Sequence, residues 1–381
     1  MTRFGFVSTF PPTRCGLATF TAALAGALSK SPGDESVIVR VDDGVPAGPS
    51  VPGVRLRIAT TLSPGDPPSR RAAAQALNGC DVVIVQHEFG IYGGPDGAEI
   101  IDLLDLIRRP VITVMHTILA APRPHQRRVT TAVVDHSDTV VAMTESGARL
   151  LVDEFGVSAS RLRVIPHGVD EWGPVVASDA PHRPTVLTWG LLGPGKGIEW
   201  GIMAIAVMRR TGIASPPLYR VLGQTHPKVL AEHGQQYRRS LWALADELGV
   251  GDLVEIDARY RTQDELALEV VTADVVLLPY DSREQTTSGV LVEAIAAGRP
   301  VIATRFPHAV ELLSDGAGIL VAHQSPTQIA AAIGTILRAP APARSAASRT
   351  AHGALANGWT SVADQYRALA ADLTMALQVA G

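Results

Sequence analysis

Lysine, cysteine and aromatic residues are scarce in this sequence. The chain has 381 residues, of which 5% are aromatic and only two, Cys15 and Cys80, are cysteines. Two cysteines without C-x-x-C spacing exclude a disulfide scaffold, a zinc ribbon and a thiol redox motif. Only three of the 33 basic residues are lysines, namely Lys30, Lys196 and Lys228. A lysine kept in such an arginine-rich chain is therefore a candidate for a specific role.

An excess of positive charge and a long apolar run are also missing. The formal net charge is -4 at pH 7 and neither half of the chain is basic, so we expect no nucleic-acid partner. No apolar run reaches the roughly 18 residues of a membrane span, and Phe4–Val7 is too short for a signal peptide. We therefore expect a cytoplasmic protein with at most peripheral membrane contact. The motifs H-E-x-x-H, G-x-S-x-G and G-x-G-x-x-G are absent, which disfavours zinc proteases, esterases and dehydrogenases.

Short runs rich in valine and isoleucine alternate with segments of helical period. This alternation predicts an α/β fold with parallel sheets, and the length predicts two domains. Helices are expected at Gly16–Ser29 and Gly97–Arg108. The strands expected in the first half are Phe4–Thr9, Ser36–Val41, Val54–Ala59, Asp81–Gln86, Val111–His116 and Thr139–Met143. Those expected in the second half are Thr185–Trp189, Leu218–Leu222, Leu253–Asp257, Asp274–Leu278, Pro300–Thr304 and Gly318–Val321.

A polar, proline-bearing stretch from Pro166 to Pro184 separates the two series of strands and predicts an interdomain linker. The alternation ends at Ala339–Pro342. Trp359–Leu377 then predicts a last amphipathic helix, whose apolar face carries Val362, Tyr366, Leu369 and Leu373. In parallel α/β sheets ligands bind beyond the carboxyl ends of the strands, so the residues after each strand are the functional candidates.

Two of these loops place glycine at a predicted helix start. Gly16 follows the first strand and opens a helix whose free N–H groups suit an anion; the alternative is an ordinary turn. Gly190–Gly197 contains Lys196 and precedes a helix that begins at Ile198. It is not a Walker A loop, because neither serine nor threonine follows the lysine. Backbone amides and an ammonium group there suit a diphosphate, and the alternative is a structural turn with a solvated lysine.

A third candidate is the segment Glu284–Ala294. Its run of threonine, serine and glycine supplies hydroxyls and amides at the start of a helix near Ser288, which predicts a second anion site. Glu293 lies inside that helix among apolar neighbours, so we expect its carboxylate to be buried and to need partners such as ribose hydroxyls. A solvated helix face is the alternative for this glutamate.

Two histidines end strands of the first half. His87 and His116 lie where the ligand crevice of the sheet is expected, which makes them candidates for sugar contact or proton transfer; a structural histidine is the alternative. A small basic cluster consists of Arg123, His125, Arg127 and Arg128. It suits an anionic acceptor, and the alternative is a solvated helix start. Asp42-Asp43-Gly44 lacks a second set of metal ligands, and we predict no obligatory metal.

Several blocks together resemble the retaining glycosyltransferases of family four, which have the GT-B architecture of two Rossmann-like domains facing a cleft. The blocks are Cys15–Ala18, His116, Ile165–Asp170, Gly190–Gly197, Ala273–Val275 and Glu293–Thr304. The resemblance implies an acceptor-binding domain at 1–168 and a nucleotide-sugar-binding domain at 169–357. It also implies that a helix within 358–381 crosses back to the first domain.

The resemblance also implies roles for individual residues. Lys196 would neutralise the donor diphosphate, Glu293 would bind the nucleotide ribose, and His116 would contact the transferred sugar. The donor phosphates would lie against Gly16, Gly190, Gly195, Thr287, Ser288 and Gly289. The acceptor would contact His87, Glu88 and Arg128.

Two positions depart from the family pattern. An arginine usually follows the first glycine of the loop, and here that position is Leu191; Arg283 and Arg305 are candidates for replacing its charge. The family also pairs two glutamates eight positions apart, and here the first of them is Gln285, next to Glu284. Glutamine still hydrogen-bonds a sugar hydroxyl, so Gln285 is kept as a catalytic candidate with His116 and Lys196.

The expected function is transfer of a hexose, mannose or glucose, from a nucleoside diphosphate sugar to a saccharide or glycoconjugate hydroxyl. Retention of configuration, no cofactor and no metal are expected. Two alternatives remain open. One is a catalytically weakened module that binds nucleotide or glycan, suggested by Leu191 and Gln285. The other is a nucleotide-sugar epimerase, for which Glu88 and Glu284 are the few available acid/base groups.

Overall fold

The computed structural model describes residues 1–46, 55–170, 183–212, 215–340 and 357–380. The chain forms two compact units, one of Met1–Gly168 with Asn357–Gly381 and one of Val169–Ala356. Asn357, which the sequence places in the second domain, groups with the first, because its Nδ2 donates a hydrogen bond to the His167 carbonyl at 3.0 Å. Most of the expected linker, 171–182, and Ala341 and Pro342 at the expected end of the second domain lie outside the described residues.

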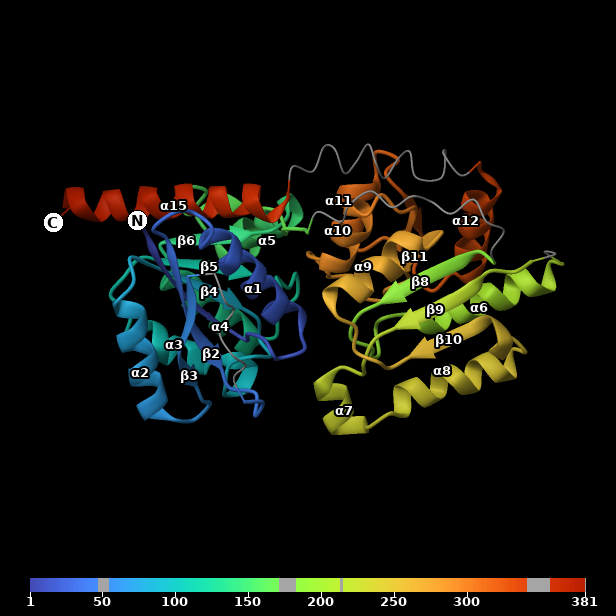
Figure 1. Cartoon of the computed structure of the whole chain (residues 1–381), viewed down its shortest axis with the longest axis horizontal. Helices are drawn as coiled ribbons and strands as arrows, with labels where there is room; N and C mark the ends of the chain where they lie inside the picture. The colour runs from blue at the N-terminus through green and yellow to red at the C-terminus, as the bar shows by residue number, and fades with distance from the viewer. Residues whose placement is uncertain (47–54, 171–182, 213–214, 341–356, 381) are drawn as a thin grey trace. The chain divides into compact units, whose positions relative to one another are not determined.

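Each unit is an α/β domain built on a parallel sheet, as predicted (Figure 1). Within the described residues, the strand order is β3-β2-β1-β4-β5-β6-β7 in the first sheet and β10-β9-β8-β11-β12-β13 in the second. The first strand of each sheet is central, and the chain reverses direction across the sheet between β1 and β4 or between β8 and β11. Such a switch point is where open α/β sheets bind ligands.

The strands of the first unit are β1 (Arg3–Ser8), β2 (Glu35–Val41), β3 (Leu56–Leu62), β4 (Val82–His87), β5 (Val111–Met115), β6 (Thr139–Ala142) and β7 (Leu162–Val164). Its helices are α1 (Gly16–Leu28), α2 (Pro67–Asn78), η1 (Pro95–Gly97), α3 (Glu99–Leu104), α4 (Pro124–Asp135), α5 (Glu145–Phe155) and α15 (Trp359–Ala380). The helix predicted at Gly97–Arg108 is shorter than expected: it begins at Glu99, since Gly97 has a φ of +75°, and it ends at Leu104. Strand β7 is not predicted by the sequence pattern.

The strands of the second unit are β8 (Thr185–Trp189), β9 (Leu218–Leu222), β10 (Val254–Asp257), β11 (Val275–Leu278), β12 (Val301–Thr304) and β13 (Ile319–Val321). Its helices are α6 (Ile198–Arg210), α7 (Pro227–His233), α8 (Gln236–Glu247), η2 (Gly251–Leu253), α9 (Gln263–Thr272), α10 (Gly289–Ala296), α11 (Pro307–Leu313) and α12 (Pro326–Arg338). All six predicted strands are present, with ends that agree within one residue.

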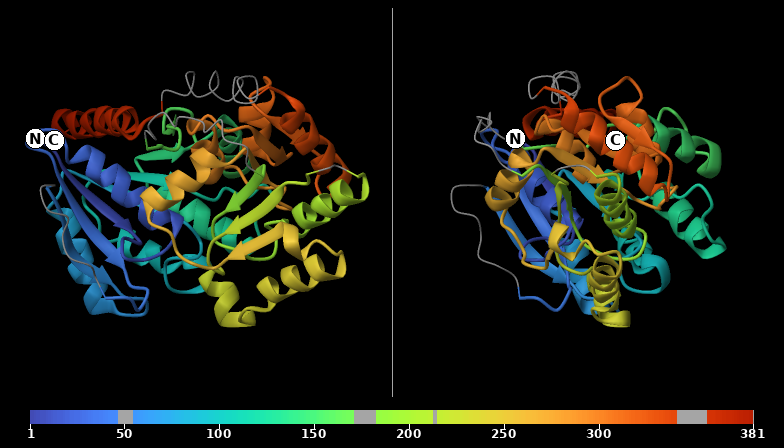
Figure 2. Two further views of the ribbon diagram at one scale, coloured as in Figure 1. Left: turned by 45° about the vertical axis from the view of Figure 1, so that its right-hand side comes forward. Right: turned by 90° about the vertical axis from the view of Figure 1, so that its right-hand side faces the viewer.

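Both sheets are buried on two faces, because alternate residues of each strand point to opposite sides. In β4, Val82 and Ile84 join the core under α1 and α15, whereas Val83 and Val85 join the core under α2, α3 and α4. Figure 1 shows α15 beside α1, as expected for a last helix that returns to the first unit. In the second unit, α6, α8 and α12 cover one face of the sheet, and α9, α10 and α11 cover the other. Figure 2 shows α6 in yellow-green and α8 in yellow.

The similar sequences Asp81–Val85 and Asp274–Leu278 serve the same structural purpose. Asp81 precedes β4, which lies next to β1, and Asp274 precedes β11, which lies next to β8. Asp81 Oδ2 accepts a hydrogen bond from the Arg3 amide at 2.8 Å, and Asp274 Oδ2 accepts one from the Thr185 amide at 2.9 Å. Each aspartate therefore fixes the start of its central strand and, with it, the switch point of its sheet.

Candidate functional site

The loop after β8 has a backbone that only glycine accommodates easily. Gly190, Gly195 and Gly197 have φ values of +122°, +90° and +63°. A Cβ on Gly197 would lie 1.8 Å from the Pro279 carbonyl oxygen, so the start of α6 packs directly on the loop after β11. Gly195 has no atom within 4 Å of an added Cβ. The glycine-rich loop, residues 190–197, is thus packed tightly at Gly197 and open at Gly195.

Lys196 lies in this loop as a partly buried cation. Its Nζ lies 4.5 Å from the centroid of the Tyr280 ring, a cation–π contact. Among the described residues no carboxylate lies within 4.0 Å of it. Burial lowers the pKa of Lys196, because the charged form loses hydration. A nearby anion would restore the stability of the charged form, which makes this side chain an anion-binding candidate.

The start of α10 offers fewer amides than the sequence predicts. Ser288 is the N-cap, and its hydroxyl accepts a hydrogen bond from the Leu291 amide at 3.3 Å. The Ser288 amide donates to Nδ1 of the buried His308 at 2.8 Å, so it is not available to a phosphate. In the described part of the chain, the amides of Gly289 and Val290 have no partner, so they are the candidates for binding an anion at this helix start.

Glu293 is partly buried on the second turn of α10. Its Oε2 accepts a hydrogen bond from Trp189 Nε1 at 3.3 Å, which links α10 to the end of β8. Burial raises the pKa of Glu293 to about 7; the Trp189 bond lowers it, and the nearby Asp170 raises it further. This carboxylate therefore changes charge near neutral pH. The sequence indicates its burial but not Trp189, its partner.

The side chain of Gln285 has a hydrogen-bond partner, whereas those of the two threonines after it do not. Gln285 Nε2 donates to the Thr287 carbonyl at 3.1 Å, so its side chain closes its own loop in this structure. The hydroxyls of Thr286 and Thr287 are buried and have no hydrogen-bond partner among the described residues. These hydroxyls are unsatisfied donors next to α10. The predicted catalytic role of Gln285 stays a prediction.

In the first unit, His116 follows β5 and contacts the end of β4. Its Nε2 is 2.6 Å from Gln86 Oε1, and Phe20 of α1 packs edge-on against its ring with centroids 4.9 Å apart. Burial lowers the pKa of His116 to about 3, and His167 and His87 lower it further. His116 is therefore neutral at physiological pH and has a ring nitrogen that accepts hydrogen bonds.

His87 and Glu88 differ sharply in exposure. The sequence predicts that His87 contacts an acceptor, but the structure buries its side chain in the core, where it is 1% exposed and burial lowers its pKa to about 4. Glu88 is only partly buried, and its Oε2 accepts a hydrogen bond from the Thr117 hydroxyl at 2.5 Å. Gln86 and Glu88 thus tie the ends of β4 and β5 together.

Gly16 begins α1, as predicted, and is exposed; its role in binding an anion stays a prediction. The N-cap is Cys15, whose Sγ accepts a hydrogen bond from the Ala18 amide at 3.4 Å. An added Cβ on Gly16 meets nothing within 4 Å. This end of the helix is open within its unit.

Most of the predicted basic cluster is already paired. Arg123 and His125 both contact Asp96, at 2.9 Å each, and Arg127 contacts Glu154 at 2.9 Å. Arg128 is exposed and has no ion pair among the described residues. It is therefore the member of this cluster that is available to an anionic ligand.

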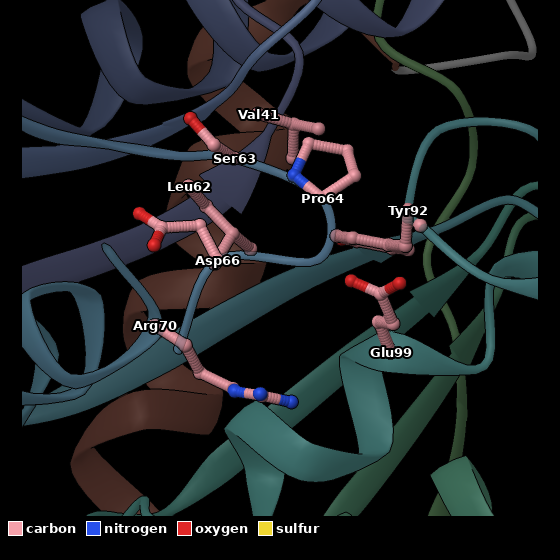
Figure 3. A pocket seen from close by; sticks show the side chains of 9 residues that line it. Val41, Leu62, Ser63, Pro64, Asp66, Arg70, Tyr92 and Glu99 are labelled. Atoms are coloured by element: carbon pink, nitrogen blue, oxygen red, sulfur yellow. The ribbon is translucent and has the colours of Figure 1, made fainter. Parts of the chain in front are cut away.

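A hollow that the sequence does not indicate lies at the carboxyl ends of β2 and β3 (Figure 3). It encloses about 300 Å³ of unfilled space, part of it open to solvent, and is lined by Val41, Leu62, Ser63, Pro64, Asp66, Arg70, Tyr92, Gly93 and Glu99. Glu99 accepts a hydrogen bond from the Gly65 amide at 2.6 Å, and Arg70 pairs with Asp102. The charged groups of the hollow are thus partly used to hold its walls together.

Two kinds of feature are absent from the described residues. They contain no group of three or more His, Cys, Asp or Glu side chains placed to hold a metal ion. None of the helices described is both long enough and apolar enough to cross a membrane.

Comparisons with known proteins identify both units. The model of "Glycosyltransferase Family 4" matches residues 15–172, and that of "Glycosyl transferases group 1" matches residues 183–339. D-inositol 3-phosphate glycosyltransferase of Acidothermus cellulolyticus is 31% identical over 249 residues, covering 60% of this chain and 54% of the relative. The enzyme of the same name from Kineococcus radiotolerans is 30% identical and covers 67% of this chain and 64% of the relative. The aligned part therefore spans between about half and just under two thirds of the length of these relatives.

Solved structures agree on the fold. HepE of Anabaena, solved in complex with UDP and glucose, has a TM-score of 0.75 and 15% identity, covering 98% of this chain and 100% of that one. Sucrose-phosphate synthase of Thermosynechococcus elongatus has a TM-score of 0.77 and 21% identity, covering 99% and 100%. At these identities the likeness establishes the fold alone. Together with the two family matches, it places this chain in the family four, group 1 glycosyltransferases, with their GT-B fold.

Proposed function

We propose that this protein is a retaining, metal-independent glycosyltransferase. It moves a hexose from a nucleoside diphosphate sugar to a hydroxyl of a saccharide or glycoconjugate. The donor binds at the second unit and the acceptor at the first. Membership of the family supports the reaction class, and the UDP bound by HepE makes UDP the first nucleotide to test, followed by GDP.

The observation that carries the proposal is the unpaired, partly buried Lys196 in the glycine-rich loop. A buried cation without a carboxylate is costly unless an anion joins it. The open amides of Gly289 and Val290 add a second positive end, because a helix N-terminus carries partial positive charge. Two such groups in one unit suit a diphosphate better than a neutral ligand.

Glu293 gives the site its nucleoside end. A carboxylate accepts two hydrogen bonds at once, which suits the two neighbouring hydroxyls of a ribose. Trp189 orients this carboxylate through the bond to its Oε2. The remaining oxygen is then available to the ligand.

The proposed catalysis is electrostatic. As the bond between sugar and diphosphate breaks, negative charge grows on the leaving phosphate and positive charge on the sugar ring. Lys196 and the start of α10 stabilise the leaving group without rearranging, which is the most effective form of such stabilisation. These fixed charges supply the role that a divalent cation has in other transferases, so the reaction needs no metal. No protein nucleophile is assigned.

The first unit offers groups for a hydroxyl-rich acceptor. The neutral His116 accepts a hydrogen bond, and Glu88 accepts one while it holds Thr117. Arg128 is free to contact a phosphate on the acceptor. The relatives named D-inositol 3-phosphate glycosyltransferase make a phosphorylated polyol a worthwhile acceptor to test beside neutral saccharides.

The test is a transfer assay in EDTA with UDP-glucose, UDP-N-acetylglucosamine, GDP-mannose and GDP-glucose. Each donor is paired with a panel of saccharides and with inositol phosphate. We expect one donor to give a product whose anomeric configuration, read by NMR, matches that of the donor. Lys196→Ala should abolish turnover, whereas Lys228→Ala, a change at an exposed lysine, should not. An inverted product, or turnover that needs an added metal, would contradict the proposed mechanism.

A binding module without turnover is the second candidate. It is favoured by Leu191, where the family has a cation, and by the bond between Gln285 and Thr287, which occupies the Gln285 amide. Tight nucleotide binding without transfer or donor hydrolysis on the whole panel would favour this candidate. Turnover with any donor would eliminate it.

A further inference from the structure

Arg238 is a buried arginine with unsatisfied hydrogen-bond donors. It lies on α8 and is 2% exposed. Its Nη2 donates to the Gly223 carbonyl at 2.6 Å, whereas Nε and Nη1 have no partner among the described residues. Buried polar groups are nearly always hydrogen-bonded, so a charged group left in this condition needs an explanation.

Three arginines on or after β9 and β10 are neutralised by carboxylates. Arg220 pairs with Glu255 and Glu269, and Arg261 pairs with Asp257 and Glu269. Arg259 also reaches Asp257, at 3.8 Å. In the described part of the chain, Arg238 has no carboxylate within 4.0 Å. Burial lowers the pKa of Arg238 and the field of Asp257 opposes this, but an arginine side chain stays protonated in proteins. Arg238 is therefore a buried positive charge without an ion-pair partner in the described part of the chain.

This charge lies directly behind the glycine-rich loop. Gly223, which accepts the Arg238 bond, follows β9 and has a φ of +141°. A Cβ on Gly223 would lie 1.9 Å from the Gly190 carbonyl oxygen, so the two backbones are in contact. The next residue of the loop is Leu191, at the position where the family has an arginine. One layer of backbone separates Arg238 from the start of that loop.

We propose that Arg238 is a positioning residue that supplies, from behind the loop, the positive charge missing at Leu191. Its field favours a diphosphate on the glycine-rich loop, and its bond to Gly223 holds that loop in place. This inference rests on the proposed function, because it needs a diphosphate at residues 190–197. The two other arginines considered for the role, Arg283 and Arg305, are exposed.

The test compares the affinities for UDP and UMP by calorimetry, or for GDP and GMP if the wild type prefers guanine. The dissociation constant for the monophosphate divided by that for the diphosphate isolates the contribution of the second phosphate. Arg238→Met should reduce this ratio about tenfold. Arg238→Gln keeps a donor for the Gly223 carbonyl and removes the charge, so we expect the same reduction. Arg238→Lys keeps a positive charge while its buried amine stays protonated and should restore part of the ratio.

Arg239→Met is the matched control, because Arg239 is the exposed neighbour on the same helix. It should leave the ratio unchanged. If Arg238 only stabilises the fold, its variants will melt at a lower temperature and will weaken UDP and UMP binding equally, which overturns the inference.

The wild-type measurement separates this inference from the proposed function. If the wild type binds none of UDP, GDP, ADP and dTDP, the proposed function fails and the role of Arg238 fails with it. If the wild type binds a nucleoside diphosphate and Arg238→Gln keeps the wild-type ratio, only the role of Arg238 is refuted.

Discussion

The charge of Glu293 should control nucleotide affinity in the neutral pH range. The pKa of this carboxyl is raised to about 7, mainly by burial. About a tenth of the molecules then carry the ionised form at pH 6 and about nine tenths at pH 8. Hydrogen bonds from ribose hydroxyls are stronger to a carboxylate than to a neutral acid. The affinity for UDP or GDP should therefore rise roughly tenfold from pH 6 to pH 8, or about 1.4 kcal/mol.

Glu293→Gln isolates this effect. The nucleotide itself loses a phosphate proton near pH 6, which changes its binding to wild type and variant alike. The ratio of the dissociation constant of Glu293→Gln to that of the wild type, measured by calorimetry from pH 5.5 to 8.5, removes that contribution. We expect this ratio to rise with pH and to level off above about pH 8.

Trp189 allows a second check on the same reasoning. Its hydrogen bond lowers the pKa of Glu293, so Trp189→Phe should move the midpoint of the profile to higher pH. The stability of the protein should respond in the opposite sense to binding. The pKa is higher in the folded state than the ordinary value of 4.5, so the free energy of unfolding should fall as the pH rises from about 4.5 to 7. A ratio that is flat or falls with pH would refute the assignment of Glu293 to the ribose.

Three further predictions concern backbone, core and histidine. Gly197→Ala should lower the free energy of unfolding by about 3 kcal/mol in chemical denaturation. The new Cβ would lie 1.8 Å from a carbonyl oxygen, and the residue has a positive φ. Gly195→Ala should cost only about 1 kcal/mol, because no atom lies within 4 Å of its added Cβ. Tyr366→Phe should raise the stability by about 1 kcal/mol, because the buried Tyr366 hydroxyl has no partner among the described residues; a loss of stability would reveal a missed partner. Gln86→Glu should raise the pKa of His116 and add a pH dependence to kcat/KM that the wild type lacks; NMR titration of the ring should show the shift.

Much of the fold could be predicted because strand ends carry local signals. Pro184 and Gly190 enclose Thr185–Trp189, and the observed strand has those bounds. Leu162–Val164 escapes prediction because three residues with an arginine in the middle give no apolar run. The helix expected at Gly97–Arg108 is too long, since apolar periodicity alone does not show where the backbone leaves the helical region.

The candidate site could be predicted only in part, because its partners are distant in the sequence. Lys196 and Glu293 stand out by scarcity and by apolar neighbours. Trp189 and His308, which hold Glu293 and Ser288, lie 104 and 20 residues away from them and leave no local pattern. Such pairs follow from tertiary packing rather than from local sequence.

The first unit shows the same limit at the end of β4. His87 is a candidate because it ends a strand, yet it is buried, and its neighbour Gln86 makes the contact with His116. Adjacent residues of a strand point to opposite faces, so an error of one residue assigns the contact with His116 to the wrong side chain.

The most direct test of the central claim is a thermal-shift panel with UDP, GDP, ADP and dTDP, each in EDTA, on the wild type and on Lys196→Ala. A ligand at 100 times its dissociation constant adds about 2.7 kcal/mol of stability, which is roughly 5–10 °C for a domain of this size. We predict a shift of this size for one nucleotide with the wild type and a much smaller shift with Lys196→Ala. An equal shift in both proteins, or no shift with any of the four nucleotides, would contradict a diphosphate site at Lys196.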